Sequence, residues 1–239
     1  MLTRSFEDLA QALRILLEAN LQLRRLLSID RGEAIGTLEN AINAKLDAFH
    51  NLYDLMQQRG LTQPNWYDVP ELCTVLAIRN ARHHNMANRI RSLFNYHRYE
   101  SKNPTKPARY LYVDFPAPPE EKGGDCFDIP LSWFDLDTFL SLPRSESRLR
   151  PPSVTAVREY LNAEAIDRCA KVKRVSKERT FFNLVPLTLN AGIALLPHVK
   201  PHVSPDSVEA THFLWHFEHV CPAETKTHEC AAIKFGLPK

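Results

Sequence analysis

Residues 5–28 read SFEDLAQALRILLEANLQLRRLLS, and this stretch sets the class of the fold. Ser5, followed three positions later by Asp8, is the pattern of a helix-capping box. The apolar side chains that follow recur every three or four positions, which places them on one face of a helix. They are Phe6, Leu9, Leu13, Leu16, Leu23 and Leu27. The stretch therefore predicts a long amphipathic helix with one buried side.

The same spacing returns after a turn near Asp30 to Gly32 and continues until Gly60, which is a typical helix stop. Its apolar members are Ile35, Leu38, Ile42, Leu46, Phe49, Leu52 and Met56. Because the connection is short, the two helices are expected to run antiparallel. The expectation is a mainly α fold that begins with a helical bundle over residues 1–103.

A third helix is predicted from Asp68, which can cap it, with Pro70 in its first turn and Glu71 completing the box. Its apolar rows are carried through to Phe94 by Leu72, Val75, Leu76, Met86, Ile90 and Leu93. The rows call for apolar residues at positions 79 and 83, but Arg79 and His83 stand there. A local conflict of this kind is expected at functional or interface sites.

The residues that break these rows carry the chemistry of metal-independent RNA cleavage. Histidine can take the proton of a ribose 2′-hydroxyl or protonate the leaving oxygen near neutral pH. Arginine can hold the phosphate with two parallel hydrogen bonds. Arg79, Asn80 and His84 are therefore the predicted catalytic residues, with His83 as a competitor for the proton-carrying role. No cofactor is expected. One helix offers one face only, so a homodimer with two facing copies is expected.

Charge is segmented along the chain. Residues 71–109 contain eight bases and two acids, whereas residues 114–137 contain seven acids and one base. The first segment suits a polyanion such as RNA, and the second could fold back on it or repel misplaced ligand. Predicted RNA contacts around the catalytic residues are Arg82, Arg89, Arg91 and Arg98 for phosphates and Tyr96 and Tyr99 for base stacking.

Arg79-Asn80, three intervening residues and His84 resemble the signature of the HEPN superfamily, the higher eukaryote and prokaryote nucleotide-binding domains. The resemblance implies a small helical bundle, usually dimeric, with Arg79 and His84 catalytic and Asn80 an accessory polar residue. It also implies a hydrolase, a metal-independent endoribonuclease that leaves a 2′,3′-cyclic phosphate. Toxin–antitoxin and antiviral defence systems, with an antitoxin or other regulatory partner, are the settings that it suggests.

Beyond Pro104 the helical period is lost. Residues 109–115 predict a strand, and residues 131–142 fit either a short helix or a second strand. Residues 104–151 are thus expected to form a β-containing insertion. A fourth helix is predicted from Pro152 to about Arg174, with a basic end, completing the bundle within a mixed region, 152–239. The apolar run 181–199 is interrupted by Pro186 and Pro197, so it predicts buried core rather than a membrane span.

The five cysteines are scattered and predict no disulfide framework, which favours a reducing compartment. Charges near the amino terminus make export unexpected, so a cytoplasmic location away from membranes is predicted.

Two alternatives to the nuclease remain. The first is a non-catalytic helical module in which the basic helix grips RNA or an acidic protein. The second is a zinc protein, because His212 and His216 lie four positions apart, a spacing that can hold one metal ion on a helix. His219 and Cys221 would complete that site, with His228 and Cys230 nearby. Core packing of the aromatic residues among them is the favoured interpretation.

Overall fold

The structure, a computed structural model, describes residues 2–84, 90–116 and 127–238. It is mainly helical with one small sheet, as the sequence predicts. The helices and 3-10 turns are α1 (Leu2–Leu27), α2 (Arg31–Gln58), α3 (Pro70–His84), α4 (Leu93–Glu100), α5 (Trp133–Leu140), α6 (Arg144–Ser147), α7 (Pro151–Tyr160), α8 (Ala163–Lys173), η1 (Lys177–Arg179), α9 (Leu184–Val199), η2 (Lys200–His202) and α10 (Val208–His219). The strands are β1 (Ala108–Asp114), β2 (Pro130–Ser132), β3 (Thr180–Asn183) and β4 (Glu229–Phe235).

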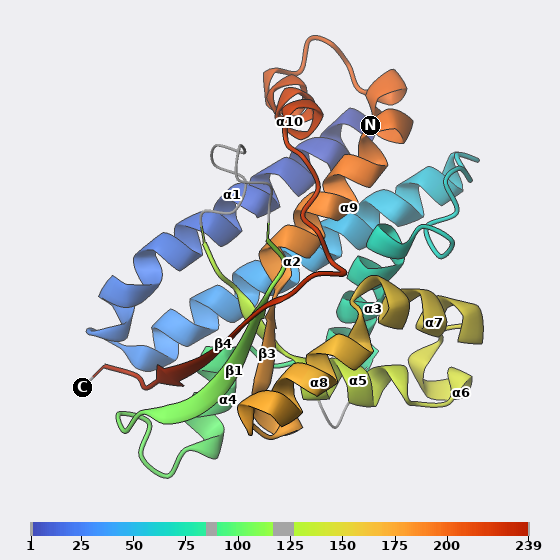
Figure 1. Ribbon diagram of the computed structural model, residues 1–239. Coiled ribbons are helices and arrows are strands. Elements are labelled where there is room, and N and C mark those ends of the chain that lie inside the picture. Colours follow the sequence, from blue (N-terminus) through green and yellow to red (C-terminus); the bar gives the residue numbers. More distant parts are fainter. Residues whose placement is uncertain (1, 85–89, 117–126, 239) are drawn as a thin grey trace.

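Helices α1 and α2 form a long antiparallel hairpin along one side of the molecule (Figure 1). The Asp30 carboxylate caps α2 by accepting a hydrogen bond from the Glu33 backbone N–H at 3.0 Å. This bond and a second from Gly32 lower the pKa of Asp30, because they favour the charged carboxylate. The predicted apolar faces of both helices lie in the core, so the first two helix predictions are confirmed. The capping role of Ser5 was wrong, because α1 begins at Leu2 and Ser5 lies inside the helix.

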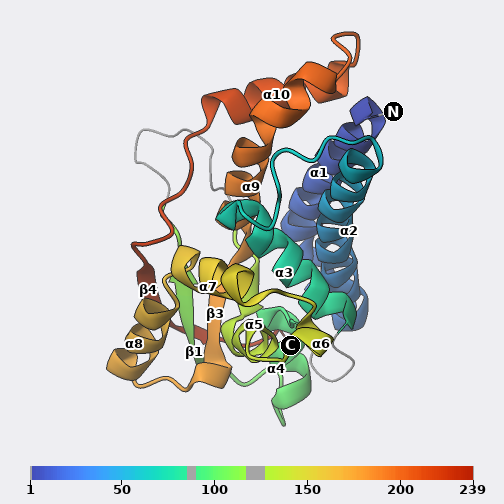
Figure 2. The same ribbon diagram turned by 90° about the vertical axis from the view of Figure 1, so that its right-hand side faces the viewer.

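Helix α3 occupies the centre of the fold. It packs against α2, α7 and α9, and every residue from Leu72 to Ile78 is buried. Figure 2 shows the layers: the α1–α2 hairpin on one side, α3 and α9 in the middle, and α8 with the sheet on the other side. The polar end of α3 therefore emerges from the interior rather than from a surface helix.

The prediction of one helix running through Phe94 was wrong. Helix α3 ends at His84, and the described chain resumes at Ile90 in an extended segment that leads into α4. Ser92 forms an isolated bridge with Leu131, and its hydroxyl caps α4 by accepting from Asn95 N–H at 3.2 Å. Tertiary pairing with the sheet thus overrides a helical pattern that contains no glycine or proline.

The four strands are ordered β2-β3-β1-β4. Strand β1 pairs in parallel with β3 and antiparallel with β4, and β2 pairs antiparallel with β3. The predicted strand over residues 109–115 is confirmed as β1. The two alternatives for 131–142 are both realised in part, because β2 leads directly into α5. However, β3 and β4 come from beyond residue 152, so the sheet is not confined to the expected insertion.

The fourth helix is also divided where the sequence predicts continuity. Asn162 adopts the left-handed conformation, with φ of 46°, between α7 and α8. Asparagine tolerates this conformation better than most residues, and its side-chain amide donates to the Lys226 carbonyl at 2.7 Å. The main hydrophobic cluster draws on all three predicted segments of the chain, which therefore share one core.

The apolar run 181–199 forms part of β3 and all of α9, and its side chains are largely buried. The core prediction for this run is confirmed. Within the described ranges, the helices are too short or too polar to cross a membrane.

Candidate functional site

The end of α3 carries the predicted catalytic residues. Arg79 is partly buried, with 18% of its side chain exposed, and its Nε donates to Asp47 Oδ1 on α2 at 3.3 Å. Asn80 is 7% exposed and lies in the buried surface of the helix. Arg79 can therefore be reached from solvent at one edge, whereas Asn80 is largely covered.

His83 and His84 are the last two residues of α3, but their side chains lie outside the described part of the structure, as does all of Arg89. The convergence of Arg79 with either histidine therefore remains a prediction. So does the facing arrangement of two copies.

Arg82, a predicted RNA contact, is 6% exposed, and its hydrogen bonds connect neighbouring elements of the fold. Its guanidinium donates to Asn43 Oδ1 at 2.6 Å, to the Ile90 carbonyl at 2.7 Å and to Glu39 Oε2 at 2.6 Å. These bonds join α2, α3 and the segment before α4. A buried arginine satisfied in this way is structural, so Arg82 does not present its charge to a ligand.

Arg91 is engaged in the same way. It contacts the fully buried Asp135 with two side-chain nitrogens, at 2.9 Å and 2.8 Å, and Glu100 at 2.9 Å. Its cation lies 4.8 Å from the centre of the Tyr96 ring. The hydrogen bonds that its guanidinium donates to Asp135 raise the pKa of Arg91, because they favour the charged form. Because Asp135 belongs to the acidic segment 114–137, the prediction that this segment folds back on the basic one is confirmed here.

The remaining predicted contacts divide between core and surface. Tyr96 is 8% exposed and packs edge-on against Tyr110 and Phe181, so it is a core residue. Tyr99 is 72% exposed, with the Arg98 cation 5.5 Å from its ring centre. Only Arg98 and Tyr99, among the described members of the predicted set around the motif, remain surface groups.

A different set of bases gathers where β1, β4 and the end of α8 meet. Arg109 of β1 stands directly opposite Lys234 of β4, and its guanidinium donates to the Lys173 carbonyl at the end of α8 at 2.9 Å. Arg174 follows immediately, in the left-handed conformation that ends α8. We call Arg109, Lys173, Arg174 and Lys234 the basic face; all four are exposed.

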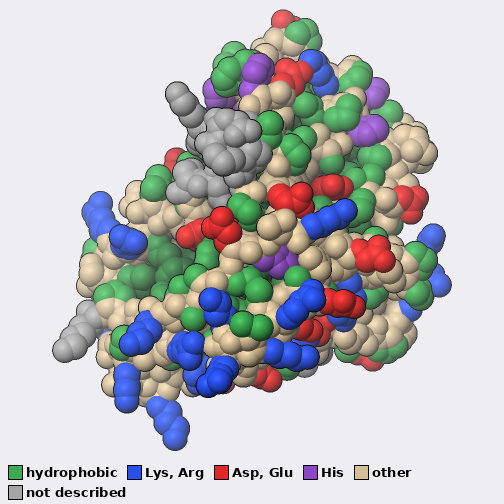
Figure 3. Space-filling view, viewed as in Figure 1, with side chains coloured by type: hydrophobic (Ala, Val, Ile, Leu, Met, Phe, Trp, Pro, Cys, Tyr) green, Lys and Arg blue, Asp and Glu red, His purple; other side chains and the backbone are tan. Residues whose placement is uncertain are grey.

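The basic face lacks compensating acids. No described carboxylate forms an ion pair with any of its four side chains, and Lys171 extends the positive charge along α8. Figure 3 shows Lys and Arg side chains crowded over the end of the molecule that Figure 1 assigns to β1, β4 and α8. Like charges directly opposite on paired strands are unfavourable, so this arrangement costs stability unless an anion occupies it.

The structure does not bring the predicted zinc ligands together. Of the predicted ligands, His212 and His219 lie on either side of Trp215, with ring-centre separations of 6.3 Å and 4.7 Å. Among residues 2–84, 90–116 and 127–238, no group of three or more His, Cys, Asp or Glu side chains could hold a metal ion. His212, His216, His219 and Cys221 thus lack the geometry of a zinc site.

Sequence reasoning placed the basic end of the fourth helix and Arg109 in separate segments and did not single out Lys234. The signal for this pair was weak: Arg109 and Lys234 each stand among apolar strand residues, but only the β1–β4 register brings them together. Searches against protein-family models, curated proteins and solved structures found no match to this chain. The HEPN resemblance therefore rests on Arg79, Asn80 and His84 alone.

Proposed function

We propose that this protein binds RNA through the basic face. The observation that supports this most directly is the Arg109–Lys234 pair, two cations placed opposite each other beside Lys173 and Arg174 with no described acid to neutralise them. A phosphate chain would relieve the repulsion and release counterions on binding. Arg98 and Tyr99, both in the last turn of α4, add a cation and an exposed aromatic ring.

RNA binding is tested by titrating a fluorescent 20-nucleotide single-stranded RNA with wild type and with the double variant Arg109→Gln, Lys234→Gln. Removing one cation that neutralises a phosphate should flatten the slope of log affinity against log salt by about 0.7. For the double variant this slope should therefore be shallower by about 1.4, and its RNA affinity should be roughly tenfold lower at 0.1 M salt.

The matched control is Arg144→Gln with Arg150→Gln, two exposed bases on α6 and just before α7. This variant should bind as wild type does. Equal weakening in both double variants would mean diffuse attraction by net charge and would reject the basic face. If the protein bound anionic vesicles but not RNA, the ligand of the basic face would be a membrane surface, and the RNA proposal would be rejected.

RNA cleavage at the end of α3 is a second candidate, and a helical bundle of HEPN type acting as a homodimer is part of it. Its support is Arg79, which breaks the apolar rows and is held by Asp47 with one edge open to solvent. A cytoplasmic location, an antitoxin-like partner and a defence role belong to this candidate. The acid–base chemistry would fall to His84, with His83 as its competitor.

The cleavage test uses 5′-labelled RNA with EDTA present and compares wild type with Arg79→Ala, His83→Ala and His84→Ala. The expected result is fragments ending in a 2′,3′-cyclic phosphate that His84→Ala abolishes while its RNA affinity stays unchanged. Equal cleavage by wild type and His84→Ala, with matched circular dichroism, would remove the nuclease and leave RNA binding standing.

A further inference from the structure

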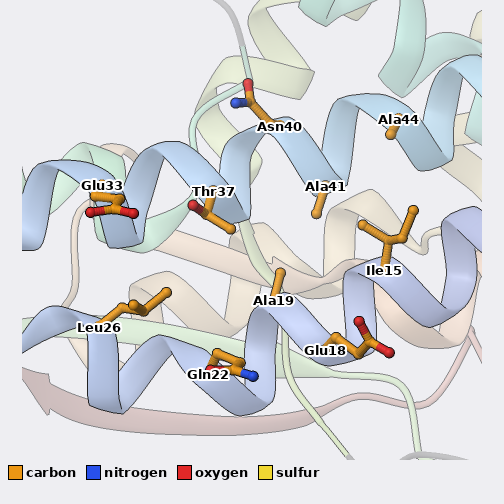
Figure 4. A pocket seen from close by; sticks show the side chains of 10 residues that line it. All are labelled: Ile15, Glu18, Ala19, Gln22, Leu26, Glu33, Thr37, Asn40, Ala41 and Ala44. Carbon is orange, nitrogen blue, oxygen red and sulfur yellow. The ribbon is translucent and has the colours of Figure 1, made fainter.

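The solvent-facing side of the α1–α2 hairpin is hollowed along much of its length. One hollow, of about 590 Å³, lies between the two helices and is lined by residues from Ile15 to Leu26 of α1 and from Glu33 to Ala44 of α2 (Figure 4). A second, of about 330 Å³, continues it toward Ser5 and Asn51. Ile15 and Ala44 line both, so the two hollows form one groove.

The outer residues that line this groove recur every three or four positions along each helix, which places them on one face. On α2 they fall at positions 33, 37, 40, 44, 47 and 51, alternating steps of four and three. On α1 they fall at positions 8, 11, 15, 18, 22 and 26, again in steps of three or four. These rows are mostly polar, and the alanines between them belong to the buried faces of α1 and α2.

The floor of the groove is small and apolar. It is formed mainly by alanines, which let another backbone approach closely: Ala12, Ala19, Ala41, Ala44 and Ala48. Ile15 projects from it with 49% of its surface exposed. From Glu33 to Asn51 the groove spans about 27 Å at 1.5 Å per residue, the length of an 18-residue helix.

The rim is acidic. Asp8, Glu18 and Glu33 line the groove, all three are exposed, and no described side chain pairs with their carboxylates. None of the described residues that line it is lysine or arginine. A second copy docked face to face would bring two acidic rims together, which is repulsive. The charge therefore selects a cationic occupant.

We propose that this groove docks one amphipathic helix of a partner protein, with small or medium apolar residues in heptad spacing and lysines or arginines flanking them. The apolar seam would cover Ile15 and the alanine floor. The flanking cations would pair with Asp8, Glu18 and Glu33. The surface is separate from the basic face, so the proposal does not depend on RNA binding.

The experiment uses two libraries of fluorescent 21-residue peptides with Ala, Val or Leu at the a and d positions. One library has Lys at e and g, and the other has Glu. Wild type should select binders from the Lys library and none from the Glu library. The variant Glu18→Lys, Glu33→Lys should reverse the preference, because the attraction changes sign with the rim.

Ala44→Trp fills the groove at an exposed position and should weaken the selected peptides at least tenfold. Leu21→Trp is the control, since Leu21 is 69% exposed and lines neither hollow. RNA affinity should be unchanged in both. Absence of Lys-library binders at 1 mM peptide, or equal binding by Ala44→Trp and Leu21→Trp, would overturn the proposal. So would a wild-type dimer that Ala44→Trp makes monomeric, because the occupant would then be a second copy.

Discussion

The bases near the end of α3 and those of the basic face belong to the same residue types but have different surroundings. Arg82 and Arg91 each contact a carboxylate from a neighbouring element and are largely removed from solvent. Arg109 and Lys234 face each other at the surface without one. These two arginines of the positive run 71–109 therefore stabilise the fold, whereas Arg109, at the end of the same run, stays exposed. The charge available to a ligand comes from residues that the fold collects from distant segments.

The largest expected effect is a loss of stability when a buried ion pair is broken. Arg91→Met leaves the fully buried Asp135 without its cation, and removing one partner of a buried pair typically costs about 3–5 kcal/mol. Urea unfolding at pH 7 should show a decrease of this size in the free energy of unfolding. The double variant Arg91→Met, Asp135→Leu should recover much of it, because no uncompensated charge remains.

Arg109→Gln is the matched control, since it removes one base from the basic face. It should change the free energy of unfolding by less than about 0.5 kcal/mol. A similar decrease in Arg91→Met and Arg109→Gln would show that the two regions do not differ in the way described.

Lys45 sharpens the comparison, because it is a buried base without a described partner. It is 1% exposed on α2, and burial lowers its pKa from 10.5 to about 7. The folded state thus holds this proton less tightly than the unfolded state. The resulting penalty is complete below pH 7 and disappears as the pH rises from 7 toward 10.5. Lys45→Met should therefore be more stable than wild type at pH 7.

The difference between Lys45→Met and wild type should shrink by about 3 kcal/mol between pH 7 and pH 9.5. Urea unfolding at several pH values measures it, and using the difference cancels the titration of tyrosines and cysteines. Lys226→Met, at an exposed position, should show no such trend. If the difference in unfolding free energy between Lys45→Met and wild type did not change with pH, the Lys45 ammonium of the wild type would be in contact with water.

Periodicity predicted the parts of this fold that depend on local pattern. The α1–α2 hairpin and β1 follow from apolar spacing and capping residues such as Asp30. The break between α3 and α4 could not be predicted in this way, because it depends on Ser92 bridging Leu131 of a distant strand. Local pattern is equally unable to predict the role of a charged residue. Whether Arg82 contacts a ligand or stabilises the fold from a buried position depends on Glu39 and Asn43, some 40 positions earlier.

The candidate site shows this limit most clearly. The conflict at Arg79 is visible in the sequence as a break in an apolar row, and the structure adds its partner Asp47. The basic face leaves no such trace, because Arg109 and Lys234 become neighbours only through the antiparallel register of β1 and β4. Local pattern can thus locate a residue that is out of place, whereas a surface assembled from distant segments needs the topology.

The smallest expected effect concerns the cost of that surface. If Arg109 and Lys234 repel each other across the strands, Lys234→Thr should raise the free energy of unfolding by a few tenths of a kcal/mol, about the size of a cross-strand pair. Threonine keeps a good strand former at the position. The gain should fall as salt is raised from 0.02 M to 0.5 M, because exposed charges are then screened. Lys226→Thr, an exposed lysine outside the sheet, should show neither the gain nor its salt dependence. A decrease in stability in Lys234→Thr at low salt would mean that Lys234 is already neutralised in the folded protein, and the basic face would then have no repulsion for an anionic ligand to relieve.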